Sequence, residues 1–312
     1  EICQVEGVEG IATDYHRLVD VVLPTTLWPN YGIVQDREYP QWDYGYHPEM
    51  IKAFKEKHGY DPREQEDPSK DEKWLKFRCD MVSEVANLVA EVVHKNGKVM
   101  SASPFPTPKM AARMVRQYWG DWNLDIVFPM VYHNFYTEDV SFVADCTIEN
   151  ARDKQDMTTL GAGVWAYNTP EMFATMDAAF NNGAQAISMF TAEEIKDPAI
   201  RKQFKEYADS ARAARKANGG VVKATYPKVA DPDPFKKEGV MKVIESRMQK
   251  LIAEANGKTE LAPLALGEYQ FKEQEDITKR YEVTDANSKK TFDVYFYFYG
   301  DILSGWNVYL KK

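Results

Sequence analysis

Cysteine is scarce in this chain, and its three cysteines lack the spacing of a metal site. Cys3, Cys79 and Cys146 form an odd set, which argues against a disulfide framework, and each stands in an apolar context typical of a small buried hydrophobe. No apolar run is long enough to span a bilayer. With a net charge of −9, the chain also lacks the clustered positive charge that nucleic-acid binding requires.

Glycine-rich phosphate fingerprints are missing as well, which argues against a dinucleotide-binding sheet. What the sequence does contain is an alternation of apolar strand-like segments and helical patterns. The predicted strands are 8–15, 98–103, 125–131, 160–166 and 186–190, and the predicted helices are 47–58, 72–95, 108–119, 141–152, 170–181 and 198–217. Such alternation is typical of βαβ units and a parallel sheet. Five units fit either an open doubly wound sheet or part of an eight-fold barrel.

The pattern changes after residue 217. Residues 218–235 are rich in Gly, Pro and Asp and are interpreted as a linker. A polar amphipathic helix over 236–255 follows, and then strands over 264–271, 277–283, 292–299 and 306–310, with turns at 285–289 and 300–301. One helix followed by an antiparallel sheet predicts a small α+β accessory domain over 236–312, with a structural or docking role.

The segment from Gly10 to Arg17 is the strongest indication of a site. An apolar run leads into Asp14, then Tyr15, His16 and Arg17. Charged residues at the carboxyl end of a parallel strand lie where α/β barrels and open α/β sheets bind ligands. Asp14 is therefore the predicted centre of the site.

Several motifs together resemble the family-10-like hypothetical glycosyl hydrolases, TIM-barrel proteins with a distant likeness to the α-amylase clan. The resemblance covers about residues 1–217. It depends on the run from Gly10 to Arg17, on Trp74-Leu75-Lys76-Phe77-Arg78, on Ser101-Ala102-Ser103-Pro104-Phe105-Pro106, on Gln117-Tyr118-Trp119-Gly120-Asp121-Trp122 and on Phe128-Pro129-Met130-Val131-Tyr132. It implies a (β/α)8 barrel of which about five of the eight βα units are present.

In that family the strand ending in Asp is about the fourth of eight. Five parallel strands do not close a barrel, because two edges and an apolar interior stay exposed. We therefore expect that a segment before Glu1, from the same gene or as a nicked companion chain, completes the domain. The resemblance also implies a bacterial envelope, periplasmic or secreted location.

The resemblance implies hydrolysis of O-glycosidic bonds in a polysaccharide or envelope glycan, without a metal or organic cofactor. Such chemistry normally needs two carboxyl groups. Asp14 is the expected nucleophile or base, kept ionised by Arg17. The strand end from Met100 to Pro104, where the amylase clan carries its acid, has no carboxylate. The possible second carboxylates are Asp43, Asp36, Glu193 and Glu194. The expected substrate-binding residues are Arg17, His16, Trp42, Tyr132, His133, Asn134, Trp165 and Tyr167.

Two alternatives stay open at this point. The absent acid fits a non-catalytic carbohydrate-binding barrel. Asp14 and His16 share a strand face and His133 ends another strand, so these three residues also fit a metal-dependent hydrolase.

Overall fold

The computed structural model describes residues 1–166, 169–219 and 232–311. These residues form two compact units. The first comprises Glu1–Val22, Glu38–Tyr132 and Val143–Ala230, and the second comprises Leu23–Arg37, His133–Phe142 and Asp231–Lys312. The second unit therefore takes in two segments that precede the expected linker. Most of that linker, residues 220–231, lies outside the described residues.

A parallel sheet forms the centre of the first unit and confirms the predicted βα alternation. Its strands follow one another in chain order. They are β1 (Gly10–Thr13), β2 (Val99–Ala102), β3 (Ile126–Val127), β4 (Thr159–Trp165) and β5 (Ala186–Phe190). The sheet curls into a half-barrel. Because every crossover runs in the same direction and parallel crossovers are right-handed, the connecting helices belong to one face of this sheet.

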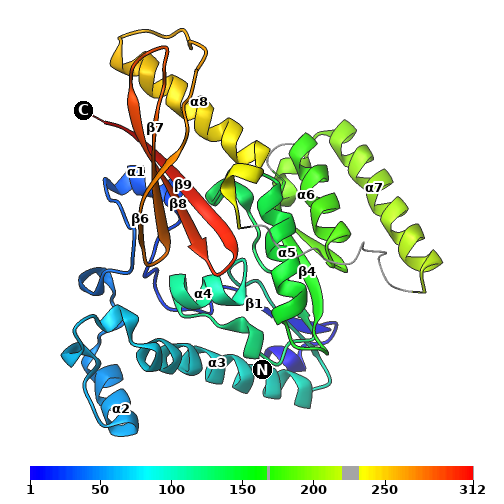
Figure 1. Cartoon of the computed structure of the whole chain (residues 1–312). Helices are drawn as coiled ribbons and strands as arrows, with labels where there is room; N and C mark the ends of the chain where they lie inside the picture. The colour runs from blue at the N-terminus through cyan, green and yellow to red at the C-terminus, as the bar shows by residue number, and fades with distance from the viewer. Residues whose placement is uncertain (167–168, 220–231, 312) are drawn as a thin grey trace. The chain divides into compact units, whose positions relative to one another are not determined.

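The helices of the first unit are α2 (Pro48–His58), α3 (Glu72–Lys95), α4 (Pro108–Val115), α5 (Ser141–Asp153), α6 (Thr169–Asn181) and α7 (Pro198–Ala217) (Figure 1). Side-chain caps explain several of their starts. Thr107 accepts a hydrogen bond from the amide of Met110 at the start of α4, and Asp197 accepts one from Ala199 at the start of α7.

Helix α4 is shorter than its predicted range of 108–119. It ends at Val115 because Arg116 adopts a left-handed conformation with φ 57°. A left-handed residue commonly ends a helix, but that residue is usually glycine. Because an arginine stands here, the sequence does not indicate that the helix ends at this position. The predicted strand 125–131 is also shorter, since β3 pairs only over Ile126–Val127. Pro129 follows two residues later and has no amide to donate.

The second unit combines one helix with an antiparallel sheet. The strands β6 (Gln270–Glu275), β7 (Thr278–Thr284), β8 (Thr291–Tyr299) and β9 (Ile302–Leu310) pair in chain order. Helix α8 (Glu238–Ala255) shares a core with β7, β8 and β9. The apolar residues of β8 and α8 form its core, including Phe292, Val294, Phe296, Val240 and Ile244. The predicted first strand over 264–271 is wrong, because the strand begins at Gln270.

The predicted turn at 285–289 is present and depends on a buried carboxylate. Asp285 accepts hydrogen bonds from the amide of Ala265 at 2.6 Å and from the amide and hydroxyl of Ser288 at 2.8 and 2.6 Å. Burial by itself raises the pKa of Asp285, but these donors outweigh it and the pKa is lowered. The turn therefore holds an ionised side chain.

We expect Asp285→Ala to lower the free energy of unfolding by about 1–3 kcal/mol, because the partly buried amides of Ala265 and Ser288 lose their acceptor. Urea denaturation followed by circular dichroism measures this. Asp301→Ala, at the exposed tip of the β8–β9 turn, is the matched control and should change little. Equal effects of the two substitutions would contradict the role given to Asp285.

Candidate functional site

Asp14 lies directly beyond the carboxyl end of β1. The strand ends at Thr13, and the Asp14 carboxylate accepts a hydrogen bond from the amide of Tyr15 at 2.7 Å. The next residue, Tyr15, has φ 54° and turns the chain away from the strand. Asp14 is exposed, so its carboxylate is open to a ligand from solvent.

Three aromatic rings gather at the carboxyl ends of the neighbouring strands β3, β4 and β5. Tyr132 stacks on Phe190 with ring centroids 5.8 Å apart and meets Trp165 edge-on, also at 5.8 Å. Trp165 and Phe190 are 6.3 Å apart. The Phe190 side chain is 53% exposed. We call these three rings the aromatic cluster, and Tyr132 and Trp165 are the members that the sequence analysis gives as expected substrate contacts.

Tyr132 also connects this cluster with Asp14. Burial raises the pKa of Tyr132 to about 12, and the negative charge of Asp14 contributes to the shift. The phenol therefore keeps its proton at neutral pH. Because the charge of Asp14 acts on Tyr132, and Tyr132 contacts Phe190 on β5, Tyr132 interacts with groups from both edge strands of the sheet.

Arg17 does not take the role expected for it. Its guanidinium pairs with Asp20 at 3.3 Å, donates to the carbonyl of Leu18 and lies over the Phe105 ring at 5.1 Å. The expectation that Arg17 holds Asp14 ionised is therefore not supported. Arg17 instead fixes the loop after β1 against the loop after β2.

The two histidines expected at the site belong to different units. The Nε2 atom of His16 lies 2.8 Å from the carbonyl oxygen of Val82 in α3, and its ring packs against Trp122. His133 is buried in the 3-10 turn His133–Phe135, which belongs to the second unit. Within the described ranges, no group of three His, Cys, Asp or Glu side chains is arranged to hold a metal ion. The described residues therefore give no support to the metal-dependent alternative.

The other expected contact residues are dispersed. Asn134 lies in the same turn as His133, within the second unit. Trp42 is partly exposed and packs on Tyr39 with ring centroids 4.5 Å apart. Tyr167 lies outside the described residues. Of the expected substrate contacts, Tyr132 and Trp165 are therefore the two that the structure brings together.

Asp43 is not available as a proton donor. Its carboxylate is buried, lies 2.5 Å from Arg78 and 3.3 Å from Arg116, and accepts a hydrogen bond from Gly45. Burial raises the pKa of Asp43, but Arg78 and Arg116 outweigh it and lower the pKa. An acid held ionised in this way does not supply a proton. The expectation that Asp43 is the second carboxylate is therefore corrected, and we assign Asp43 a structural role.

Asp43 belongs to a larger buried ion cluster that the sequence did not reveal. Arg116 donates to Glu38 at 2.6 and 3.1 Å, and Arg113 also pairs with Glu38. We call Glu38, Asp43, Arg78, Arg113 and Arg116 the ion cluster. It attaches the loop after residue 37 to α3 and α4.

The remaining acid candidates are not members of this cluster. Asp36 belongs to the second unit, where its carbonyl oxygen accepts a hydrogen bond from Thr278. Glu193 and Glu194 are exposed in the 3-10 turn Ala192–Ile195, which follows directly after β5 and Phe190. These two are the candidates attached to a strand end that also carries a ring of the aromatic cluster.

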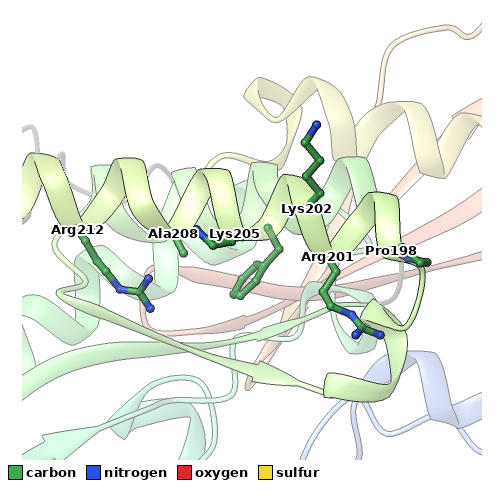
Figure 2. Close-up of a pocket in the computed structure, with 7 residues that line it drawn as sticks. Pro198, Arg201, Lys202, Lys205, Ala208 and Arg212 are labelled. Atoms are coloured by element: carbon green, nitrogen blue, oxygen red, sulfur yellow. The ribbon is translucent and has the colours of Figure 1, made fainter.

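An open groove of about 470 Å³ runs along α7. Figure 2 shows the side chains that line it, with Arg201 and Arg212 directed to the same side of the helix. Its lining is apolar at Phe204 and Ala208 and cationic at Arg201, Lys202, Lys205 and Arg212. No residue of α7 is buried. The groove therefore lies along an incompletely covered helix.

None of the helices in the described ranges combines the length and hydropathy that crossing a bilayer requires. Comparison with family models, with curated proteins and with solved structures gives no match.

Proposed function

We propose that the protein is a glycoside hydrolase that cleaves O-glycosidic bonds in a polysaccharide or envelope glycan. The observation that carries the proposal is the aromatic cluster beside Asp14, at the carboxyl ends of parallel strands. Aromatic faces take up the apolar face of a pyranose ring, and a carboxylate supplies the nucleophile or base. In this proposal Asp14 performs that step and Tyr132, Trp165 and Phe190 orient the sugar.

Glu193 and Glu194 are the proposed proton donors. Both are exposed and lie next to Phe190 along the chain, whereas Asp43 is sequestered in the ion cluster. A donor at β5 and a nucleophile or base at β1 then approach the bond from the two edges of the curled sheet, as two flanking carboxyl groups must.

We also propose that the half-barrel is part of a complete (β/α)8 barrel. Exposure along the strands supports it. The central strand β4 is buried over five consecutive residues, whereas β1 and β5 have no fully buried residue. Unpaired strand edges are normally covered. Further βα units, from a preceding segment of the same gene or from a companion chain, would pair with these edges and cover α7. An envelope, periplasmic or secreted location forms part of the same proposal.

A non-catalytic carbohydrate-binding barrel is the second candidate. It is favoured by the end of β2, where Ser101, Ala102 and Ser103 supply no carboxylate. The ring contacts of the aromatic cluster serve binding equally well, so only turnover separates the two candidates.

The test is release of reducing ends from a panel of soluble polysaccharides and peptidoglycan by the purified chain, with heat-treated protein as the blank. We expect new reducing ends from at least one substrate, and fewer from Trp165→Ala, which removes the central ring of the cluster. Binding without reducing-end release would reject hydrolysis and support the second candidate.

A further inference from the structure

Helix α3 of the first unit carries an exposed row of apolar side chains. Met81, Val85, Leu88 and Val92 are 38%, 50%, 54% and 56% exposed, respectively. Their separations of four, three and four residues place them in one line along the helix. We call these four residues the α3 stripe. A contiguous exposed apolar surface of this kind marks a place where another helix packs.

The neighbouring elements of the first unit pack on a different flank of α3. Ser83 accepts a hydrogen bond from the indole of Trp122 at 3.0 Å, and Asn87 donates to the carbonyl of Asp121 at 3.2 Å. At about 100° per residue, Ser83 and Asn87 lie on the side of the helix opposite the α3 stripe. Because α3 follows β1, the first strand of the sheet, the stripe belongs to the free end of the half-barrel.

The groove on α7 is the corresponding feature at the other end of the sheet. Helix α7 follows β5, the last strand, and its Tyr207 packs on α6, where the phenol donates to Asp177 at 2.8 Å. The groove lies on another flank of α7. It repeats the separations of four, three and four residues through Arg201, Lys205, Ala208 and Arg212.

The stripe and the groove complement each other in polarity and in charge. The groove combines apolar side chains with four cations, whereas residues 80–92 of α3 contain three acids and no Lys, Arg or His. The acids at the two ends of that segment pair with lysines of the same helix, and Glu84 stands beside the middle of the stripe. An apolar row flanked by acid therefore fits an apolar groove flanked by cations.

We infer that two copies of this chain associate, with the α3 stripe of each copy packed in the α7 groove of its partner. The contact is made twice about a twofold axis. It closes because each copy is a half-barrel with the stripe at one end and the groove at the other. The free edges of β1 and β5 then lie beside those of the partner, which covers them.

A second copy is thus the companion chain that covers both ends of the half-barrel at once. The closed sheet then holds five strands from each copy in place of the eight strands of a (β/α)8 barrel. A preceding segment of the same gene would occupy the same two flanks and exclude the second copy, so the mass in solution separates the two. The inference does not depend on the hydrolase proposal, since association is measured without a substrate.

Sedimentation equilibrium of the purified chain over a concentration series tests the inference. We expect the mass to rise to twice the chain mass of 35.8 kDa and no further. Leu88→Lys removes an apolar contact and places a cation against the cationic groove. It should raise the dimer Kd about a hundredfold, since each contact is made twice. Met157→Lys is the matched control, because Met157 is 92% exposed and belongs to neither helix, and it should leave Kd unchanged.

Charge reversal in the groove tests whether the stripe meets the groove. Arg212→Glu removes a cation that faces the acids of α3, and it should raise the dimer Kd about tenfold. Combined with Leu88→Lys, it places opposite charges at the contact and should restore part of the lost association. Circular dichroism and thermal melting of each variant check that it is folded.

A monomer at every concentration would overturn the inference, as would a dimer that Leu88→Lys leaves intact. A dimer that is lost in Leu88→Lys but unchanged in Arg212→Glu would mean that α3 packs on something other than the groove, and it would also overturn the inference. Masses that continue to rise beyond the dimer would overturn the closed twofold arrangement. A dimer that releases no reducing ends would reject the hydrolase proposal alone.

Discussion

Asp14→Asn should lower kcat for glycan hydrolysis by about a hundredfold to ten-thousandfold. This is the range expected when a side chain that transfers a proton is removed. The substitution keeps the shape of the side chain and its ability to accept the hydrogen bond from Tyr15. Binding of the sugar by the aromatic cluster is therefore expected to persist, with KM changed little. Initial rates over a range of substrate concentrations separate the two parameters.

Asp20→Asn is the control for this experiment. Asp20 lies in the same segment and pairs with Arg17, and it makes none of the contacts that connect Asp14 with Tyr132. Its removal tests whether disturbance of the loop alone lowers activity. If Asp20→Asn and Asp14→Asn reduce kcat equally, or if Asp14→Asn keeps most of the activity, Asp14 is not the nucleophile or base.

The parts of the fold that depend on neighbours in sequence were predictable. Helices α3 and α7 have the predicted bounds of 72–95 and 198–217, and β5 has the predicted bounds of 186–190. Each is bounded by local signals, such as the cap of Asp197 at the start of α7. Tyr132 and Trp165 were also predictable as neighbours, because parallel strands bring their carboxyl ends to one edge of a sheet.

Pairings between charged side chains were not predictable. Arg17 is equally far along the chain from Asp14 and from Asp20, so spacing does not choose between them, and the structure selects Asp20. The partners of Asp43 are farther still, at separations of 35 residues for Arg78 and 73 for Arg116. No local pattern carries such a contact, and Asp43 in a polar loop has the composition of an exposed acid.

The position of the edge strand β6 was predicted wrongly for another reason. Its sequence, Gln270–Glu275, is polar and almost wholly exposed. Charged residues protect an edge strand from pairing with other chains, and they also remove the alternation from which a strand is recognised. The apolar residues Leu264 and Leu266 drew the prediction toward the preceding segment, where they pack against the core of the second unit as partly buried residues.

Glu38→Gln should lower the free energy of unfolding by about 3–5 kcal/mol, because it leaves buried guanidinium charge uncompensated. The side chains of Glu38 and Arg116 are 3% and 1% exposed, respectively, and they form a bidentate salt bridge. The guanidinium of Arg116 also donates to the carbonyls of Ala112 and Arg113 at the end of α4. Urea denaturation at pH 7 measures the change.

Asp80→Asn is the control, because Asp80 pairs with Lys76 on the exposed side of α3. Such a pair is worth less than about 1 kcal/mol, and its loss should be barely measurable. If Glu38→Gln costs no more than Asp80→Asn, the ion cluster does not hold the loop after residue 37 to α3 and α4.

The same variant has a defined pH dependence. Burial raises the pKa of Glu38, but Arg116 and Arg113 outweigh it, so the pKa is lowered below its ordinary value of 4.5. A carboxyl group with a lowered pKa contributes stability above its unfolded-state pKa and loses it as the pH falls through the folded-state pKa. The difference between the unmodified chain and Glu38→Gln should therefore be constant above about pH 5 and shrink below about pH 4. A difference that instead grows toward acid pH would mean that Glu38 is protonated in the folded chain and does not neutralise Arg116.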